Sequence, residues 1–435
     1  MKRSTFLLSA TLLFSIGCTL SAADIFVSLK TGKNKNAGTP EAPLKNIWKA
    51  VEKAAPGDVI HVAEGVYPGK TSRGWIEVNK PISIIGGYSS DFSQRNVLQY
   101  RTMLQPTNKQ NATKPVFGTL TINTRNAGAK SMVVIDGLIF DHTYSNNYHA
   151  VEGKPAGFAD GMLTIPPAKG KQPNPTMDRY LLHANTDGVL IIKNCLFLNG
   201  SNYAVNVQHF SGQVQLINNV FAGNRMVGAE VRTTNGKPYM VEYVFAYNTV
   251  LFTWTRTKSF EDMGYGVRAN EGVISKIYNN IFGLNCMAGF DNTKGNPAKK
   301  KVSLDNNVFF LNKKADVAIT VSPNIQFMKA DEEGFEDLGD LDGMESAEGN
   351  IVIKDPAVFK NVIDSNYLQA FLNATYTEKV DYDPNSPVNQ FRAAFGMNKQ
   401  GSISSKVSMY ANCYPMESAL KFFGALKDFG AQPIK

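Results

Sequence analysis

Charged residues alternate with small or apolar residues in two short segments, GAEVR (228–232) and GYGVR (264–268). Such alternation predicts strands whose charged side chains point away from the core. Three further segments align with them, namely AVNVQ (204–208), GFDNT (289–293) and DVAIT (316–320). The first outward column then reads Asn206, Glu230, Gly266, Asp291 and Ala318. The second column reads Gln208, Arg232, Arg268, Thr293 and Thr320.

These columns predict that Arg232 and Arg268 stack on consecutive strands with carboxylates beside them. Two guanidinium groups at one strand spacing repel each other unless an anionic group lies between them. A sugar carboxylate or sulfate matches the planar fork of donors that arginine presents. The same residues also fit ordinary surface ion pairs, Glu230 with Arg232 and Asp291 with Arg268, and the sequence leaves this alternative open.

Hydrolysis of a glycosidic bond is a second chemistry that the columns allow. Glycosidases place two carboxylates about 5 to 9.5 Å apart, according to whether they retain or invert the anomeric configuration. Glu230 and Asp291 are predicted two strands apart with Gly266 between them, which is close to that span. A non-catalytic glycan-binding or cell-surface protein, in which this face binds without cleaving, is a third alternative.

Long loops border this face, which is typical of the groove of a functional site. The segments 254–263 and 235–240 supply candidate residues for catalysis and binding: Trp254, Arg256, Lys258, Asp262 and Tyr239. Trp254 and Tyr239 either stack on sugar rings or pack the loops down. Together with Arg256, Gln208 and Asn206 they form the predicted substrate-binding set. Longer inserts at 144–160 and 166–183 carry His149 and His183.

The strands belong to a repeat. Its copies are KNCLFLN (193–199), NNVFAGN (218–224), NNIFGLN (279–285) and NNVFFLN (306–312), with YNTVLFT (247–253) as a degraded copy. One unit is too short to bury its own apolar face, so the copies must stack as parallel coils. We expect inward Asn side chains to bond along a column. We expect the phenylalanines of the copies to stack likewise: Phe197, Phe221, Phe282 and Phe309.

The repeat resembles those of right-handed parallel β-helix proteins of the pectate-lyase-like superfamily. Residues 24–69 are similar to the opening of secreted bacterial members, with a Val-Ser strand, a Gly-Thr-x-x-x-Pro turn, an amphipathic helix and a Pro-Gly-Asp turn. The resemblance covers roughly residues 24 to 320 and implies an all-β, right-handed, single-stranded solenoid. The helix is expected over 44–54, capping the N-terminal end of the core. The superfamily includes lyases, hydrolases, esterases and non-enzymes, so the resemblance specifies the fold more than the reaction.

The resemblance makes a polysaccharide lyase, which cleaves an anionic, uronate-containing polymer by β-elimination, the leading functional prediction. Lyases of this fold often neutralise the uronate carboxylate with calcium and remove the C5 proton with Arg or Lys. Here Arg232 or Arg268 would neutralise the carboxylate or act as base, and Lys258 is the chemically easier base. The expected calcium ligands are Glu230, Asp291 and Asp262, with Asn206 as an alternative oxygen ligand.

The first 23 residues read as a secretory signal peptide. Lys2 and Arg3 precede an apolar stretch at 6–16, and the small residues of Ser21-Ala22-Ala23 precede the expected cleavage site. A lipid anchor at Cys18 is the alternative. Either signal predicts export to the periplasm, the cell surface or the medium. No later segment is apolar enough to span a bilayer.

The mature chain, 24–435, is predicted to form one β-helix domain. Its parts are an N-terminal cap and first coil (24–69), coils with loop inserts (70–350), and closing coils with a C-terminal helix (351–435), the helix lying over 416–430. A formal charge of +8 favours an anionic partner. We expect that partner to be a polysaccharide and not a nucleic acid. The remaining cysteines, at 195, 286 and 413, do not form a disulfide scaffold.

Overall fold

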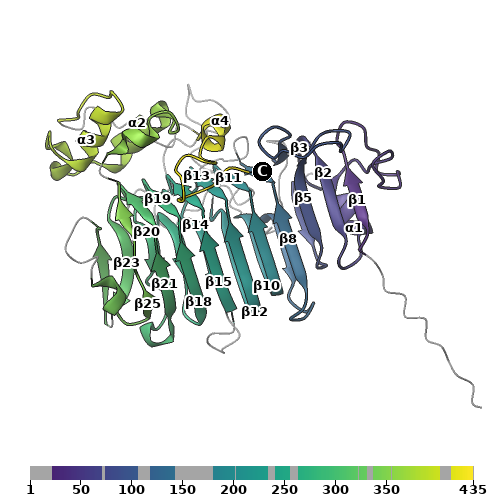
Figure 1. Ribbon diagram of the computed structural model, residues 1–435, viewed down its shortest axis with the longest axis horizontal. Coiled ribbons are helices and arrows are strands. Elements are labelled where there is room, and N and C mark those ends of the chain that lie inside the picture. The colour runs from purple at the N-terminus through teal and green to yellow at the C-terminus, as the bar shows by residue number, and fades with distance from the viewer. Residues whose placement is uncertain are drawn as a thin grey trace, which may run out of the picture.

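The chain folds into a rod of stacked parallel coils (Figure 1), the right-handed parallel β-helix that the sequence predicted. The computed structural model describes residues 22–70, 74–105, 118–142, 180–200, 202–233, 241–254, 263–321, 323–330, 337–353, 355–401 and 413–434. Cys18 and nearly all of the predicted signal peptide lie outside these ranges. Within them, no helix is long and apolar enough to cross a membrane.

Two sheets form the walls of the rod. The larger sheet consists of β1 (Asp24–Val27), β2 (Val59–Ala63), β4 (Ile76–Val78), β5 (Ser83–Tyr88), β7 (Gly118–Thr124), β8 (Met132–Asp136), β10 (Tyr180–Lys193), β12 (Val205–Ile217), β14 (Val227–Arg232), β15 (Val241–Ala246), β17 (Tyr265–Ala269), β18 (Val273–Tyr278), β20 (Ala288–Asn292), β21 (Lys301–Asp305), β23 (Ala315–Val321), β24 (Asn324–Met328) and β25 (Met344–Ser346). The smaller sheet consists of β3 (Gly65–Tyr67), β6 (Thr102–Leu104), β9 (Ile139–Asp141), β11 (Leu196–Leu198), β13 (Val220–Ala222), β16 (Thr249–Leu251), β19 (Ile281–Gly283), β22 (Val308–Phe310) and β26 (Ile351–Val352). Among the described strands every pairing is parallel except the β23–β24 hairpin.

One coil passes once through the smaller sheet and twice through the larger one, as in the run β13, β14, β15. In β10 and β12 the two passes through the larger sheet join into a single bent strand, with a register shift between Thr186 and Gly188. The inward residues of each strand form a continuous apolar core. The coils therefore stack, as a unit with one apolar face requires.

The paired asparagines of the repeat hold successive coils together. Asn219 donates to Asn248 at 3.0 Å, Asn248 to Asn280 at 3.2 Å, Asn280 to Asn307 at 2.9 Å and Asn307 to Asn350 at 3.1 Å. These amides are buried or nearly so, and each bond runs from one coil to the next. The predicted column of inward asparagines is confirmed, and it lies two residues before the phenylalanine position of the copies, where the copy at 193–199 has Cys195 instead.

In each copy the residue just before that position has a different role, because it turns the chain in a left-handed backbone conformation. The φ angles are 53° at Asn194, 59° at Asn218, 54° at Tyr247, 56° at Asn279 and 52° at Asn306. Asparagine tolerates this region better than other non-glycine residues. Tyr247, in the degraded copy, occupies the same strained position without that advantage.

Stacked phenylalanines fill the core beside the asparagines, as predicted. Ring centroids are 4.9 Å apart for Phe197 and Phe221 and 5.4 Å apart for Phe282 and Phe309. The degraded copy has Val250 at this position. Phe245 of β15 fills the gap, with centroids 5.9 Å from Phe221 and 6.1 Å from Phe282. The core thus keeps its aromatic column where the repeat loses its phenylalanine.

Helix α1 (Ile47–Lys53) lies beside β1 and β2 at the N-terminal end of the rod (Figure 1). It is shorter than the predicted 44–54. Ile47, Ala50 and Val51 are buried in the core, as the apolar face of an amphipathic helix should be. That α1 closes the end of the core stays a prediction.

The C-terminal part forms a helical layer over the smaller sheet (Figure 1). The layer contains α2 (Ser365–Thr375), α3 (Pro387–Ala394) and α4 (Met416–Leu420), with 3-10 turns η5 (Pro356–Phe359) and η6 (Lys379–Tyr382). Two further 3-10 turns, η2 (Pro297–Lys299) and η4 (Leu338–Asp340), lie in loops of the solenoid. Outward residues of the smaller sheet, such as Leu251 and Phe310, share an apolar cluster with Phe371 and Phe391 of the layer. The expected closing coils are thus reduced to β26.

The predicted helix over 416–430 is wrong beyond Leu420. Gly424 has a φ of 93°, which a right-handed helix does not allow, and its N–H bonds to the Ala431 carbonyl at 2.6 Å. The chain therefore turns back after one short helix. Its apolar residues, including Phe422 and Leu426, still pack on the helical layer.

Candidate functional site

A row of polar side chains crosses the outer face of five neighbouring strands in the larger sheet. His183 on β10, Asn206 on β12, Glu230 on β14, Arg268 on β17 and Asp291 on β20 are successive register partners. We call these five residues the polar row. The residues that alternate with them along the strands face the core: Val205, Val207, Ala229, Val231, Val267 and Phe290. The predicted inward and outward faces are confirmed.

The register corrects the predicted columns. Arg268 lies opposite Glu230, and not beside Arg232, and it replaces Gly266 as the residue between Glu230 and Asp291. The sequence alignment was displaced by two residues at GYGVR. A shift by two leaves every side chain on its original face, so the alternation of apolar and polar residues could not detect it.

Three glycines reveal the correct alignment. A Cβ atom on Gly228 would lie 2.5 Å from the Gly266 carbonyl oxygen, and one on Gly266 would lie 2.5 Å from that of Gly289. The three backbones thus approach too closely for any side chain. Glu230 and Asp291 each follow the aligned glycine by two residues, as Arg268 follows Gly266. Aligning Gly266, the second glycine of GYGVR, with Gly228 and Gly289 would have placed the polar row correctly.

Arg268 and Asp291 form a buried ion pair. Arg268 is 3% exposed and Asp291 is fully buried, and the guanidinium Nε donates to Asp291 Oδ2. The other carboxylate oxygen accepts from the Thr293 N–H at 3.0 Å and from its hydroxyl at 2.6 Å. Burial alone would lower the pKa of Arg268, but the charges of Asp291, Tyr203 and Glu230 raise it above its usual value. Arg268 therefore keeps its charge, which excludes it as a base.

The arrangement does not fit a calcium ion held by Glu230 and Asp291. The Arg268 guanidinium lies between the two carboxylates, and the Asn270 amide donates to Glu230 Oε1 at 2.8 Å. A cation between two candidate ligands repels a second cation. In the described ranges no three His, Cys, Asp or Glu side chains gather as metal ligands. Asp262, the third predicted ligand, lies outside the described residues.

Arg232 differs from Arg268 in that part of it reaches the surface. It lies beyond Glu230 on β14, is partly exposed, and has Gln208 of β12 as its register partner. Its Nε is buried without a hydrogen-bond partner in the part of the chain that the structure describes. A planar donor group of this kind is suited to a carboxylate.

His183 lies at the β10 end of the polar row. Its Nδ1 is 3.2 Å from the Asn206 amide oxygen, and its ring stacks on Tyr180 with centroids 5.3 Å apart. Burial and the charge of Arg232 lower the pKa of His183 to about 4, against the opposing effect of the hydrogen bond to Asn206. The imidazole is therefore neutral at pH 7 and is able to accept a proton.

Tyr203 completes the group around Arg232. Its ring centroid is 5.6 Å from that of Tyr180. Burial and the negative charge of Glu230 raise the pKa of Tyr203, so its hydroxyl keeps its proton at neutral pH. Tyr180 and Tyr203 were not predicted from the sequence, because Tyr180 is the first residue of β10 and Tyr203 lies in the segment before β12, where the repeat gives no periodic signal.

Lys300 is a second nearby base, at the turn between β20 and β21. Burial lowers its pKa to about 8, although the charges of Asp291 and Glu271 act in the opposite direction. The ammonium donates to the Asn292 carbonyl and the residue is 3% exposed. A group enclosed in this way does not reach a polymer on the surface.

Trp254 is enclosed in the structure and does not offer a face to a sugar. It is 2% exposed and belongs to the apolar cluster beneath the helical layer. Its indole N–H donates to the Gly223 carbonyl at 3.2 Å, and Arg225 lies 5.0 Å from the ring centroid. Of the two open alternatives for Trp254, packing is therefore confirmed. The other predicted loop residues, Arg256, Lys258, Asp262 and Tyr239, lie outside the described residues.

Comparisons with known proteins agree with the fold. A family model described as "Protein of unknown function (DUF1565)" matches residues 30–137. No curated protein matches this sequence. The chain has the right-handed parallel β-helix fold of the pectate-lyase-like proteins that its repeats resemble.

Three solved structures illustrate the likeness. A complex of XylC with xylose shares 10% identity over 76% of this chain, with a TM-score of 0.37, and the match spans 65% of XylC, less than two thirds of its length. Pectate lyase Pel9A shares 14% identity over 71% of this chain and 74% of its own, with a TM-score of 0.36. A rhamnogalacturonan lyase shares 13% over 69% and 77%, with a TM-score of 0.32. Likeness at this level concerns the fold alone and says nothing about a reaction.

Proposed function

We propose that the protein binds an anionic, uronate-containing polysaccharide beside the polar row and cleaves it by β-elimination. The observation that carries this proposal is the partly exposed Arg232 guanidinium with a neutral imidazole and a protonated phenol nearby. These three groups match the three requirements of the reaction, which are a cation for the carboxylate, a proton acceptor and a proton donor.

The reaction follows from these roles. Arg232 binds the uronate carboxylate, which makes the C5 proton more acidic. His183 accepts that proton, and the C5–H electron pair forms the C4–C5 double bond as the C4–O bond breaks. Tyr203 gives its proton to the leaving oxygen. The products are an unsaturated uronate and a shortened chain, and the two side chains recover their original protonation through solvent.

Substrate binding would also strengthen the base. The positive charge of Arg232 contributes to the low pKa of His183. A bound carboxylate compensates that charge, so the proton affinity of the imidazole rises when substrate is present. The weak base of the free protein thus becomes a better one in the complex.

The other members of the polar row position this group. Glu230 accepts a hydrogen bond from the Asn270 amide, and Arg268 and Asp291 pair with each other, so these three side chains are engaged within the protein. These contacts argue against a glycoside hydrolase, because such an enzyme needs one carboxyl group as proton donor, whereas Asp291 is paired with Arg268 and Glu230 accepts from Asn270. We therefore favour elimination.

A panel of uronate polymers tests the proposal. We expect release of a product that absorbs in the ultraviolet through its new double bond, at the same rate as new reducing ends appear. Arg232→Ala and His183→Gln should each reduce that rate by about 100-fold or more. Arg101→Ala is a matched control, since Arg101 pairs with Glu417 of the helical layer.

Reducing ends without the absorbance would mean hydrolysis and would contradict the proposal. Retention on a glycan gel without any product would identify a non-catalytic binding protein. Equal activity of Arg232→Ala and Arg101→Ala would exclude Arg232 as the carboxylate ligand.

A further inference from the structure

A second row of side chains runs parallel to the polar row, two residues further along the strands. Asn123 on β7 is the register partner of Asn185 on β10, and Asn185 is in turn the partner of Gln208 on β12. Gln208 is the partner of Arg232 on β14. Asn270, directly after β17, continues the row on the other side of Arg232. We call Asn123, Asn185, Gln208 and Asn270 the amide row.

The amide row reaches the surface of the rod. Asn123 is exposed, and the other three amides are partly exposed. A side-chain amide carries hydrogen-bond donors and an acceptor, so it matches the hydroxyl groups of a sugar but does not neutralise a carboxylate. Neighbouring strands are about 4.8 Å apart, which is close to the length of one pyranose unit in an extended polymer. Successive sugars of a polymer that lies along the rod would therefore meet successive strands.

The formal charges of the polar row, the amide row and Arg232 cancel. The positive charges are those of Arg232 and Arg268. The negative charges are those of Glu230 and Asp291. Arg268 is already bonded to Asp291, whereas part of Arg232 reaches the surface. One carboxylate of a ligand therefore meets a cation in these rows, and a polymer with a carboxylate on every sugar would bring its further negative charges over amides.

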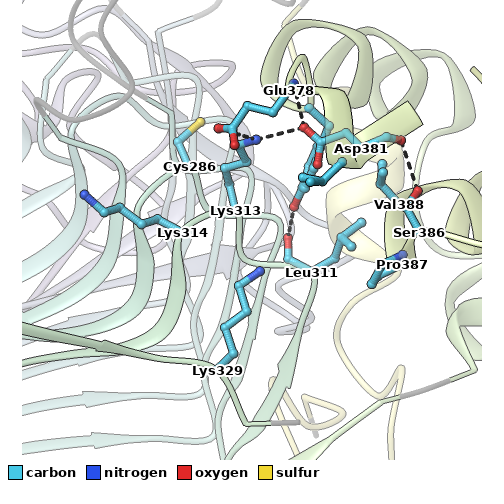
Figure 2. Close-up of a pocket in the computed structure, with 12 residues that line it drawn as sticks. Cys286, Leu311, Lys313, Lys314, Lys329, Glu378, Asp381, Ser386, Pro387 and Val388 are labelled. Atoms are coloured by element: carbon cyan, nitrogen blue, oxygen red, sulfur yellow. Dashed lines mark hydrogen bonds and ion pairs between the residues drawn. The ribbon is translucent and has the colours of Figure 1, made fainter. Parts of the chain in front are cut away.

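A polar cavity elsewhere on the rod is balanced in a similar way. It lies where the last coils meet the helical layer and has a volume of about 520 Å³ (Figure 2). Lys313 Nζ lies 3.0 Å from Glu378 Oε1 and 2.9 Å from Asp381 Oδ2, as the dashed lines in Figure 2 show. This cavity and the smaller one that adjoins it are lined by three lysines and three carboxylates, namely Lys313, Lys314, Lys329, Glu378, Asp381 and Asp316. The described residues of this junction therefore give no reason to expect a densely charged polymer.

We infer that the substrate is an acidic polysaccharide in which neutral sugars separate single uronates. Arg232 binds the carboxylate of the uronate that is cleaved, and the amide row binds the hydroxyl groups of the neutral units beside it. This inference rests on the proposed function, because it places the polymer beside the polar row and gives Arg232 its carboxylate. It goes further in that a homopolymer of uronates is not the preferred substrate.

Initial rates on polymers of graded charge test the inference. The probes are polygalacturonate and polymannuronate, with a uronate at every sugar, and heparosan and deacylated gellan, in which neutral sugars separate the uronates. We expect kcat/KM for one of the latter two polymers to exceed that for either homopolymer by about tenfold or more. Faster elimination from a homopolymer would overturn the inference and leave the proposed β-elimination intact.

If none of the four polymers is eliminated, the proposed function fails, and affinity electrophoresis in the same polymers decides the inference. Stronger retention in heparosan or gellan than in the homopolymers would support it. Stronger retention in a homopolymer, or no retention in any of the four, would overturn it as well.

A double variant locates the binding surface. Asn123→Ala/Asn185→Ala should raise KM for the better substrate by about tenfold with little change in kcat, because two hydrogen-bonding amides are lost away from the reacting bond. Asn324→Ala/Gln326→Ala removes two exposed amides from β24 of the same sheet and should leave KM unchanged. Equal KM values for the two double variants would overturn the role of the amide row.

An added charge tests whether this row reads the spacing of uronates. Gln208→Arg places a second cation beside Arg232, so it should raise kcat/KM on polygalacturonate relative to heparosan by about tenfold. Gln326→Arg adds the same charge at an exposed position on β24 and should not change that ratio. An equal ratio in the two arginine variants would overturn the inference.

Discussion

Arg268 on β17 lies directly opposite Glu230 on β14, and the next strand places Asp291 on the other side of the same guanidinium. The arginine is thus enclosed between two carboxylates beneath the accessible surface. The neighbouring negative charges raise the pKa of Arg268 above its usual value, so it stays charged. The enclosed pair belongs to the same outer face as Arg232 and His183.

The first prediction concerns this ion pair. Asp291→Ala leaves the Arg268 charge buried without its closest partner, so we expect a loss of about 3 to 5 kcal/mol in the free energy of unfolding. Urea denaturation followed by circular dichroism measures it. Replacing both residues, as in Arg268→Met/Asp291→Leu, should recover most of the loss, because no unpaired charge then remains.

A surface pair provides the comparison. Glu242 and Lys276 lie 3.2 Å apart with both side chains partly exposed. Glu242→Ala should cost less than about 1 kcal/mol. If Asp291→Ala were no more harmful than Glu242→Ala, the enclosed pair would not stabilise the sheet as we describe.

The fold could be predicted from sequence because the repeat carries its own geometry. Copies of Asn-Asn-x-Phe specify the left-handed turn, the ladder of asparagine hydrogen bonds and the column of phenylalanine rings. They do so whatever the length of the loops between them. The candidate functional site was harder to predict, because its residues lie on strands whose register depends on loops of irregular length. A two-residue slip at Gly266 preserved every buried face and still exchanged the neighbours of Arg268. The C-terminal layer was missed and the role of Trp254 was left open for another reason, because no local pattern shows that distant helices cover the smaller sheet.

The second prediction tests the glycine column that sets this register. A Cβ atom on Gly266 would lie 2.5 Å from the Gly289 carbonyl oxygen, which is closer than a real contact permits. Gly266→Ala should therefore push the two strands apart and destabilise the protein by about 1 to 3 kcal/mol, or more. Gly401→Ala is the control, since a Cβ atom there meets nothing within 4 Å. Equal urea midpoints for the two variants would show that the backbones do not approach as described.

The third prediction is a stabilising change. Tyr247 has a φ of 54° at the turn where neighbouring copies have asparagine. Tyr247→Asn should relieve the left-handed strain and raise the free energy of unfolding by about 1 kcal/mol. Tyr247→Ala keeps the strain and loses the edge contact with Tyr278, whose ring centroid is 6.3 Å away, so it should lower stability. A lower urea midpoint for Tyr247→Asn than for the unmodified protein would contradict this reasoning.

The fourth prediction follows from the low pKa of His183, about 4 against an ordinary value of 6.5. Between these two pH values the unfolded chain binds a proton at this residue and the folded chain does not. The unfolded state is therefore favoured progressively as pH falls from 6.5 to 4, with a loss of roughly 3 kcal/mol at the lower end. His183→Gln, which cannot titrate, should remove this part of the pH dependence.

Urea midpoints at pH 7 and pH 4.5, measured for both proteins, give the comparison directly. The unmodified protein should lose more stability on acidification than His183→Gln. Because burial also lowers the pKa of His209, a smaller pH dependence should remain in the variant. Parallel losses in the two proteins would mean that His183 is protonated in the folded state at pH 4.5. Burial would then not lower the pKa of His183 as described.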